Sequence, residues 1–216
     1  MQNAVPGSAG AGADAPVAER VASRTLAGRT EAYADEVRRL VDAGYAVMRS
    51  TGTLDPRVTD IVREAGLSNQ AFYRHFRSKD ELLVALLDDG QRQLLTYLEH
   101  RMAAADPGAA RVRAWVGGVM EQARNPAAAE NTRPFAINNS RLADRYPDEV
   151  ARSRELLVAS LRDAVTDAGG DPQHDTDVIY HLAIGCMNDA LVARRRPTDA
   201  DVEHLVQFVL GGLRGT

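Results

Sequence analysis

The sequence predicts an all-α fold, and three observations carry that prediction. Apolar side chains recur at helical spacing over most of the chain, as in Tyr33, Val37, Leu40, Val41 and Tyr45. Alternating runs of β-branched residues between turn signals, which would predict strands, are missing from the sequence. Helix start signals are frequent, either as Asp followed by Pro or as Ser followed three residues later by Glu.

The N-terminal half of the chain divides into an arm and four helices. Residues 1–22 are rich in Gly, Ala and Pro and are predicted to form a disordered arm. A first helix covers residues 28–50 and ends at "STGTLDP". Asp55-Pro56 starts a short second helix that ends at Ala65-Gly66. Ser68 caps a third helix over about 69–76, and Ser78 with Glu81 opens a long fourth helix that runs to about Met102.

The C-terminal half of the sequence predicts further helices. A fifth helix includes Val112 and Met120 and ends at Asn125-Pro126, and a less regular segment favours a helix over about 132–144. Pro147 starts the next helix, which runs to Gly169-Gly170. Asp171-Pro172 starts a helix that reaches about Arg195, and a last helix begins after Thr198, which has cap spacing to Asp201.

Composition sets the broad class of protein. The chain has 216 residues, of which 44% are hydrophobic and 26% charged, as in soluble globular domains. The formal net charge is −4, so any contact with nucleic acid must use a local basic patch. A single cysteine excludes an intrachain disulfide and a metal site built on several thiolates, and we expect neither a metal nor a cofactor. With no apolar run of about 18 residues and no signal-peptide pattern, we expect a cytoplasmic location and no membrane contact.

The two short helices joined by a turn with Gly66 describe a helix-turn-helix. In that motif the second helix lies in the major groove of DNA, and its N-terminal residues meet the base edges. Inward positions that hold the two helices together are Ala65, Gly66, Leu67, Ala71, Phe72 and Phe76. The sequence therefore predicts a DNA-binding domain over residues 23–77.

The segment "VTDIVREAGLSNQAFYRHFRSKDELL" resembles the DNA-binding region of the tetracycline-repressor (TetR) family. The matching positions are Asp60, Ile61, Ala65, Gly66, Leu67, Ser68, Phe72, Tyr73, His75, Phe76, Ser78, Lys79, Asp80 and Leu82. The resemblance covers roughly residues 28–90, and the rest of the chain is similar only in its helical architecture. Gln70, Ala71 and Pro56-Arg57 depart from the family pattern, so the DNA sequence bound by relatives does not carry over.

Candidate DNA-binding residues come partly from the resemblance and partly from chemistry. The resemblance implies that Tyr73, His75 and Lys79 contact the DNA backbone, and Lys79 at a helix N-terminus would strengthen an anion site. Asn and Gln amides at the start of the third helix can pair with adenine. Arg74 would hold a phosphate or read guanine. The full candidate set is Arg57, Ser68, Asn69, Gln70, Tyr73, Arg74, His75 and Lys79; the alternative for each is ordinary surface polarity.

The resemblance implies that residues 78–216 form a body that binds a small molecule and dimerises. Candidate ligand-binding residues are Trp115, Met120, Phe135, Asn138, Asn139, His181 and Met187. For the apolar members the alternative is plain core, for the two Asn it is helix capping, and for His181 it is a hydrogen-bonded core position. Few aromatics and several Met suggest an apolar or amphipathic effector.

The last two helices are the candidate dimer interface, because the first of them is apolar nearly all round. The candidate interface residues are Ile179, Ala183, Cys186, Ala190, Val202, Val206, Val209 and Leu213. The competing interpretation is that both helices are plain core of a monomer.

These expectations combine into a homodimeric repressor of transcription that a small molecule releases from a palindromic operator in double-stranded DNA. One alternative is a dimeric DNA-binding protein without a ligand, which a body lacking a cavity would favour. An all-helical enzyme is the other, but the sequence has no HExxH, GxSxG or phosphate-binding Gly-rich motif and no arranged catalytic residues.

Overall fold

The structure, a computed structural model, describes residues 17–53 and 55–213, with side chains from residue 25 onward. Helices are its regular elements: α1 Val17–Thr51, α2 Val58–Ala65, α3 Asn69–His75, α4 Lys79–Ala103, α5 Ala109–Arg124, α6 Pro126–Ile137, α7 Asn139–Arg145, α8 Pro147–Asp167, α9 His174–Val192 and α10 Asp199–Leu213. The all-α prediction is confirmed for this part of the chain. Over the same residues, no helix has the length and apolar character needed to cross a bilayer.

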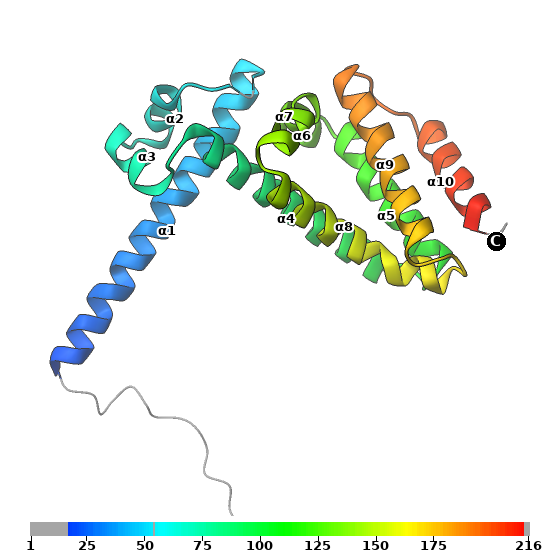
Figure 1. Cartoon of the computed structure of the whole chain (residues 1–216), viewed down its shortest axis with the longest axis horizontal. Coiled ribbons are helices and arrows are strands. Elements are labelled where there is room, and N and C mark those ends of the chain that lie inside the picture. Colours follow the sequence, from blue (N-terminus) through cyan, green and yellow to red (C-terminus); the bar gives the residue numbers. More distant parts are fainter. Residues whose placement is uncertain (1–16, 54, 214–216) are drawn as a thin grey trace, which may run out of the picture.

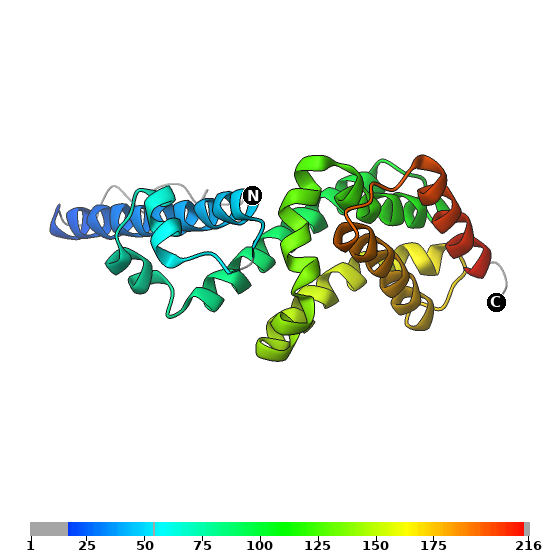
Figure 2. The same ribbon diagram turned by 90° about the horizontal axis from the view of Figure 1, so that it is seen from above.

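The molecule is elongated, with a head at one end and a helical body at the other (Figures 1 and 2). The head consists of α1, α2 and α3, and α4 leads from it into the body. The body packs α4, α8 and α9 around α5, with α10 on the outer side of α5 and α9. The N-terminal half of α1 projects away from the rest of the head and from the body (Figure 1).

The head is held by a small core that continues into the fourth helix. Leu40, Ile61 and Phe72, one each from α1, α2 and α3, are fully buried together with Leu82 and Leu86 of α4. The head core thus extends about two turns into α4, past the boundary that the sequence predicts at residues 77/78. The N-terminal end of α4 and the helix α3 therefore share one hydrophobic cluster.

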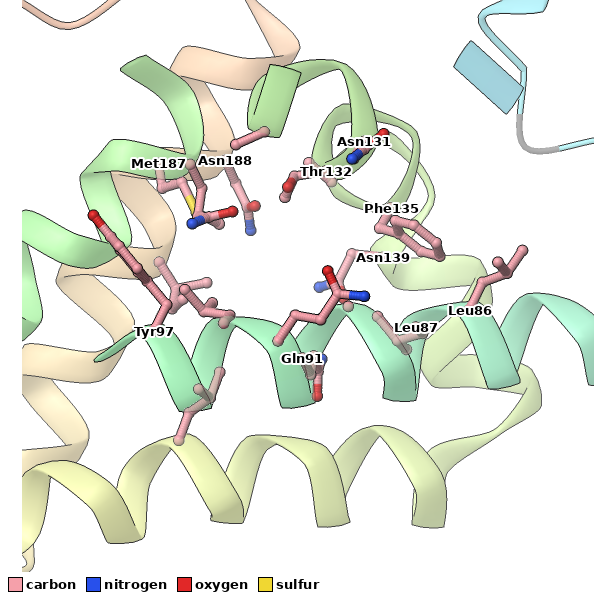
Figure 3. Close-up of a pocket in the computed structure, with 18 of the residues that line it drawn as sticks. Leu86, Leu87, Gln91, Tyr97, Asn131, Thr132, Phe135, Asn139, Met187 and Asn188 are labelled. Carbon is pink, nitrogen blue, oxygen red and sulfur yellow. The ribbon is translucent and has the colours of Figure 1, made fainter. Parts of the chain in front are cut away.

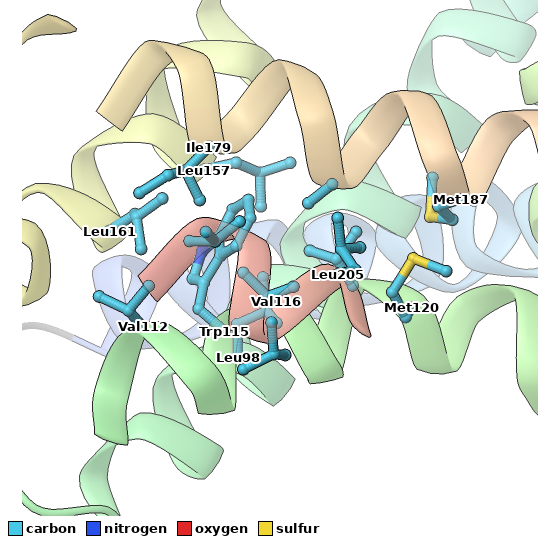
Figure 4. Close-up of a cluster of buried hydrophobic side chains, with 14 of the residues drawn as sticks. Leu98, Val112, Trp115, Val116, Met120, Leu157, Leu161, Ile179, Met187 and Leu205 are labelled. Carbon is cyan, nitrogen blue, oxygen red and sulfur yellow. The ribbon is translucent and has the colours of Figure 1, made fainter. Parts of the chain in front are cut away.

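The body has its own core, centred on Trp115 of α5 (Figure 4). Trp115 is fully buried, and its indole N–H donates a 3.1 Å hydrogen bond to the Ser160 hydroxyl of α8. Gly118 lets α4 approach α5 closely, because a Cβ at that position would lie 2.5 Å from a methyl group of Leu98. These contacts fix α4, α5 and α8 relative to one another.

Two element predictions need correction near the N-terminus. The first helix begins at Val17 rather than near residue 28, so residues 17–22 of the predicted arm are helical, while residues 1–16 lie outside the described part. Ala, Glu and Arg propagate a helix at little cost once a packed segment has nucleated it. The second helix begins at Val58 with Arg57 as N-cap, so Asp55 does not cap it.

Other helix-start signals act as the sequence predicts, either fully or in part. Ser68 and Ser78 cap α3 and α4 through their hydroxyls, although the Glu81 carboxylate accepts from the Arg77 amide and not from Ser78. Thr198 and Asp201 form the predicted reciprocal cap of α10. The helix expected over 132–144 is instead two helices, α6 and α7, because Asn125 and Pro126 start α6 early and α7 begins anew at Asn139.

Candidate DNA-binding face and ligand cavity

The third helix presents its first turn to solvent. The Ser68 hydroxyl accepts a 3.1 Å hydrogen bond from the Ala71 amide, which fixes the start of α3. Gly66, in the left-handed region at φ 64°, makes the turn before it. Asn69 and Gln70 follow and are exposed, and Tyr73 one turn later is 60% exposed. The capped turn thus holds three polar side chains on one outward surface.

Glu36 of α1 connects the first helix to the end of the third. Its carboxylate accepts hydrogen bonds from the Arg74 guanidinium and from His75 Nε2, the latter at 2.6 Å. The hydrogen bond from His75 and then that from Arg74 hold the pKa of Glu36 below its usual range. Arg74 keeps about half of its side chain exposed.

The structure corrects the expectation for His75. Its side chain is fully buried, its ring lies 4.1 Å from the ring of Tyr33, and Nε2 is bonded to Glu36. The imidazole therefore joins α3 to α1 and does not reach the outer surface of α3. Sequence spacing could not reveal this, since the partner residues lie about forty positions earlier in the chain.

Lys79 also has an acidic partner. Its ammonium group forms an ion pair with Asp55, whose pKa is lowered by that hydrogen bond and charge. The Lys79 side chain is 28% exposed and Asp55 is 62% exposed, so the pair lies at the surface beside the N-terminus of α4. Arg57, also exposed, precedes α2 nearby. Asp55 therefore neutralises a cation of the candidate phosphate-binding surface.

The body contains a cavity of about 630 Å³ between α4, α6 and α9, with α1 at one side (Figure 3). It extends along α4 from Leu86 to Tyr97, eleven residues apart, which corresponds to about 16 Å at the helical rise. Tyr97 and Met187 lie at one end, and Leu86 and Phe135 lie at the other (Figure 3). The cavity is elongated and large enough for a small organic molecule.

The structure places three of the seven candidate ligand residues at this cavity, namely Phe135, Asn139 and Met187. The other four need correction. Trp115 and Met120 belong to the body core. The Asn138 side chain donates to the Pro134 carbonyl outside the cavity, and His181 is exposed beside Arg154. A helical period alone does not distinguish a core-facing side from a cavity-facing side, because both are apolar.

Several lining residues were missed by the sequence analysis. Gln91 lies on the α4 stripe between Leu87 and Leu94, where a polar residue interrupts an apolar series. That interruption was a usable signal. Tyr45 and Arg49 reach the cavity from α1, on the far side of the predicted domain boundary, and only the tertiary structure brings them there.

The candidate dimer residues mostly face the chain's own core. Ile179, Ala183, Ala190, Val206, Val209 and Leu213 are buried against the body, and only Cys186 and Val202 are partly accessible. This corrects the assignment of the interface side chains. The apolar residues that α9 and α10 expose are instead Val178 at 63%, Val192 at 53% and Phe208 at 67%.

A capped helix-turn-helix on a head that shares α4 with a cavity-bearing body is the architecture expected of a DNA-binding transcriptional regulator. Residues 40–86 match the sequence profile of the bacterial regulatory proteins of the tetR family. The helix-turn-helix region thus matches the TetR family, as the resemblance implied, and this is a family of bacterial regulatory proteins.

Solved structures share the fold over most of the chain. The fatty acid degradation regulator FadR from Bacillus halodurans is 17% identical with a TM-score of 0.68, covering 83% of this chain and 96% of that one. FadR from Bacillus subtilis, solved in complex with stearoyl-CoA, is 16% identical with a TM-score of 0.60, covering 82% and 96%. A TetR-family regulator from Streptomyces coelicolor is 21% identical with a TM-score of 0.60, covering 84% and 94%.

Proposed function

We propose that the protein is a dimeric, ligand-responsive repressor that leaves a palindromic operator when a small molecule occupies the body cavity. The observation that carries the proposal is the double role of α4. Leu82 and Leu86 of α4 belong to the head core, and Leu86 also lines the cavity together with Leu94 and Tyr97. One continuous helix therefore packs against the recognition helix at its N-terminal end and lines the cavity along its middle, where the ligand would bind.

On the DNA side, the exposed first turn of α3 supports base reading by Asn69 and Gln70. Phosphate contacts would come from Tyr73 and Arg74 on α3, from Arg57 before α2 and from Lys79 at the start of α4. Ser68 acts through its cap of α3. Because the net charge of the chain is negative, these basic side chains would supply the phosphate contacts, with phosphates taking the place of Glu36 at Arg74 and of Asp55 at Lys79.

The coupling between cavity and head would pass through α6 and α7. Phe135 and Asn139 line the cavity, and on α7 the Arg145 guanidinium forms a 3.0 Å ion pair with Asp80 in the first turn of α4. Arg141 lies 3.5 Å from the same carboxylate. A ligand that shifts α6 and α7 would thus move the N-terminal end of α4. To release DNA, the ligand need only bind more tightly to the conformation in which the spacing of the two heads of the dimer does not fit the operator.

For the dimer interface, we propose the exposed side of α9 and α10 in place of the buried candidate residues. Val178, Val192 and Phe208 are exposed there, and a Cβ added at Gly185 or Gly211 would meet nothing within 4 Å. These glycines face open space and would allow two copies to approach closely. A two-fold axis through this surface would place two recognition helices on one side of the dimer.

The cavity favours a ligand-responsive regulator over a DNA-binding protein whose body only dimerises. Selection of bound sequences from random DNA, followed by footprinting, tests the whole proposal. We expect an inverted repeat with both halves protected. The Arg57→Ala variant should bind DNA more weakly. Arg196→Ala, which removes an exposed arginine in the loop before α10, is the matched control and should bind as the wild type does. Protection of one asymmetric half-site by one chain would overturn the proposal.

A further inference from the structure

The side chains that line the cavity reveal the chemistry of its ligand, if the cavity is the effector site proposed above. Six of them are carboxamides: Gln91, Gln93, Gln122, Asn131, Asn139 and Asn188. Gln93 donates to Asp89, and Asn131 accepts from Arg49. Within residues 17–53 and 55–213, the side chains of the other four have no hydrogen-bond partner. The cavity therefore contains a set of unused donors and acceptors.

Gln91 is the most informative of these residues. Its Oε1 atom is buried and has no hydrogen-bond partner among the described residues. A buried acceptor without a donor costs free energy, so the site favours an occupant that supplies an O–H or N–H group there. Each neighbouring carboxamide can donate through its NH₂ group and accept through its oxygen, which suits hydroxyl and amide groups equally.

Few of the side chains that line the cavity carry a full charge, and their charges cancel. Among the lining residues, Asp42 and Arg49 each carry one charge, and both are exposed at the α1 side. Arg49 is already bonded to Asn131 at 2.9 Å. Burial and then the nearby Asp89 carboxylate raise the pKa of Tyr45, so its hydroxyl stays neutral. A strongly anionic or cationic ligand would lose hydration here without gaining a matching set of opposite charges.

The deepest part of the cavity is apolar. Leu86, Leu157 and Met187 are almost completely buried, and Phe135, Leu94 and Ile184 lie around them. Together with the length of about 16 Å along α4, this favours a ligand with an extended apolar part. The carboxamides come from α4, α5, α6, α7 and α9, so polar groups face the ligand from several sides.

We infer that the cavity takes an uncharged, elongated amphipathic molecule bearing several hydroxyl or amide groups, and that carboxamide side chains recognise it. This inference rests on the proposed ligand response and specifies its chemistry. It also separates this chain from the FadR structure that contains stearoyl-CoA, because the many negative charges of an acyl-CoA have no counterpart in this lining.

The test compares probes that share a ten-carbon chain and differ in the head group: n-decyl β-D-glucoside, 1-decanol, decyl sulfate, decyltrimethylammonium and decanoyl-CoA. Each is titrated into the full chain below its micelle concentration, with calorimetry and thermal stability as readouts. We expect the glucoside to bind most tightly. Gln91→Met should weaken glucoside binding about tenfold and leave 1-decanol unaffected. Gln173→Met, which changes an exposed glutamine outside the cavity, is the matched control and should alter neither.

Asn188→Leu is a second variant, for use if Gln91→Met does not fold, and should also weaken the glucoside selectively. Tighter binding of decyl sulfate, decyltrimethylammonium or decanoyl-CoA would overturn the ligand class while leaving a ligand-responsive regulator intact. Unchanged glucoside affinity in both cavity variants would overturn recognition by carboxamides. If no probe binds or stabilises the protein, the ligand class is wrong, and the ligand response itself loses its support.

Discussion

The ion pair between Asp55 and Lys79 makes a specific prediction about DNA affinity. In the free protein the Lys79 ammonium forms an ion pair with Asp55. The Lys79 side chain is 28% exposed and the Asp55 side chain is 62% exposed. Exposed pairs of this kind contribute only about 0.2–1 kcal/mol to stability. Removing either partner should therefore leave folding almost unchanged, so that effects on DNA binding can be measured directly.

Asp55→Asn should strengthen binding to any DNA, because Lys79 no longer has to leave a carboxylate to reach a phosphate and one repulsive charge is removed. The pair energy of about 0.2–1 kcal/mol corresponds to roughly 1.4- to fivefold tighter binding per chain. Lys79→Ala should weaken binding to specific and random DNA alike. Loss of one phosphate contact lowers the slope of log K against log salt by about 0.9 per chain.

Fluorescence anisotropy over a salt series measures both quantities on the wild type, the two single variants and the double variant. Asp163→Asn, which removes an exposed acid on α8, serves as the charge-matched control and should not affect DNA binding. The reasoning is refuted if Lys79→Ala has the wild-type salt slope, or if Asp55→Asn is no tighter than Asp163→Asn.

The remaining predictions concern other parts of the molecule. Asn69→Ala should cost about 1–3 kcal/mol on the selected operator and almost nothing on random DNA, which competition binding would measure. Phe208→Asp should give a folded monomer by light scattering, whereas Val206→Asp should unfold the body, because Phe208 is exposed and Val206 is buried; a dimeric Phe208→Asp would move the interface elsewhere. Trp115→Ala should lower the free energy of unfolding by about 3–5 kcal/mol in urea titrations, since the indole is fully buried, and a loss below 1 kcal/mol would contradict its central place in the core. Glu36 has a lowered pKa, so its contribution to stability is present above the ordinary value of 4.5 and is lost as pH falls through the lowered value; Glu36→Gln should remove this part of the acid sensitivity in a pH titration of unfolding.

Local sequence rules were sufficient wherever the deciding interactions lie within a few residues. Ser68 and Ser78 cap the helices that their spacing predicts, and Thr198 forms a reciprocal cap with Asp201. The turn at Gly66 has the left-handed backbone that a helix-turn-helix needs. Because these local signals follow one another closely in the sequence, the match to the TetR family is visible within a single segment.

The sequence by itself determined the all-α class, most helix boundaries, the helix-turn-helix and the exposed amides that begin its second helix. Only the tertiary structure decided what each apolar or polar side chain faces. His75 is buried against Tyr33 and Glu36 from α1, and Val206 packs into the core of its own chain. The cavity joins residues from Asp42 to Asn188. The physical reason is that helical periodicity fixes which residues share a side, while the neighbour covering that side depends on how distant helices pack.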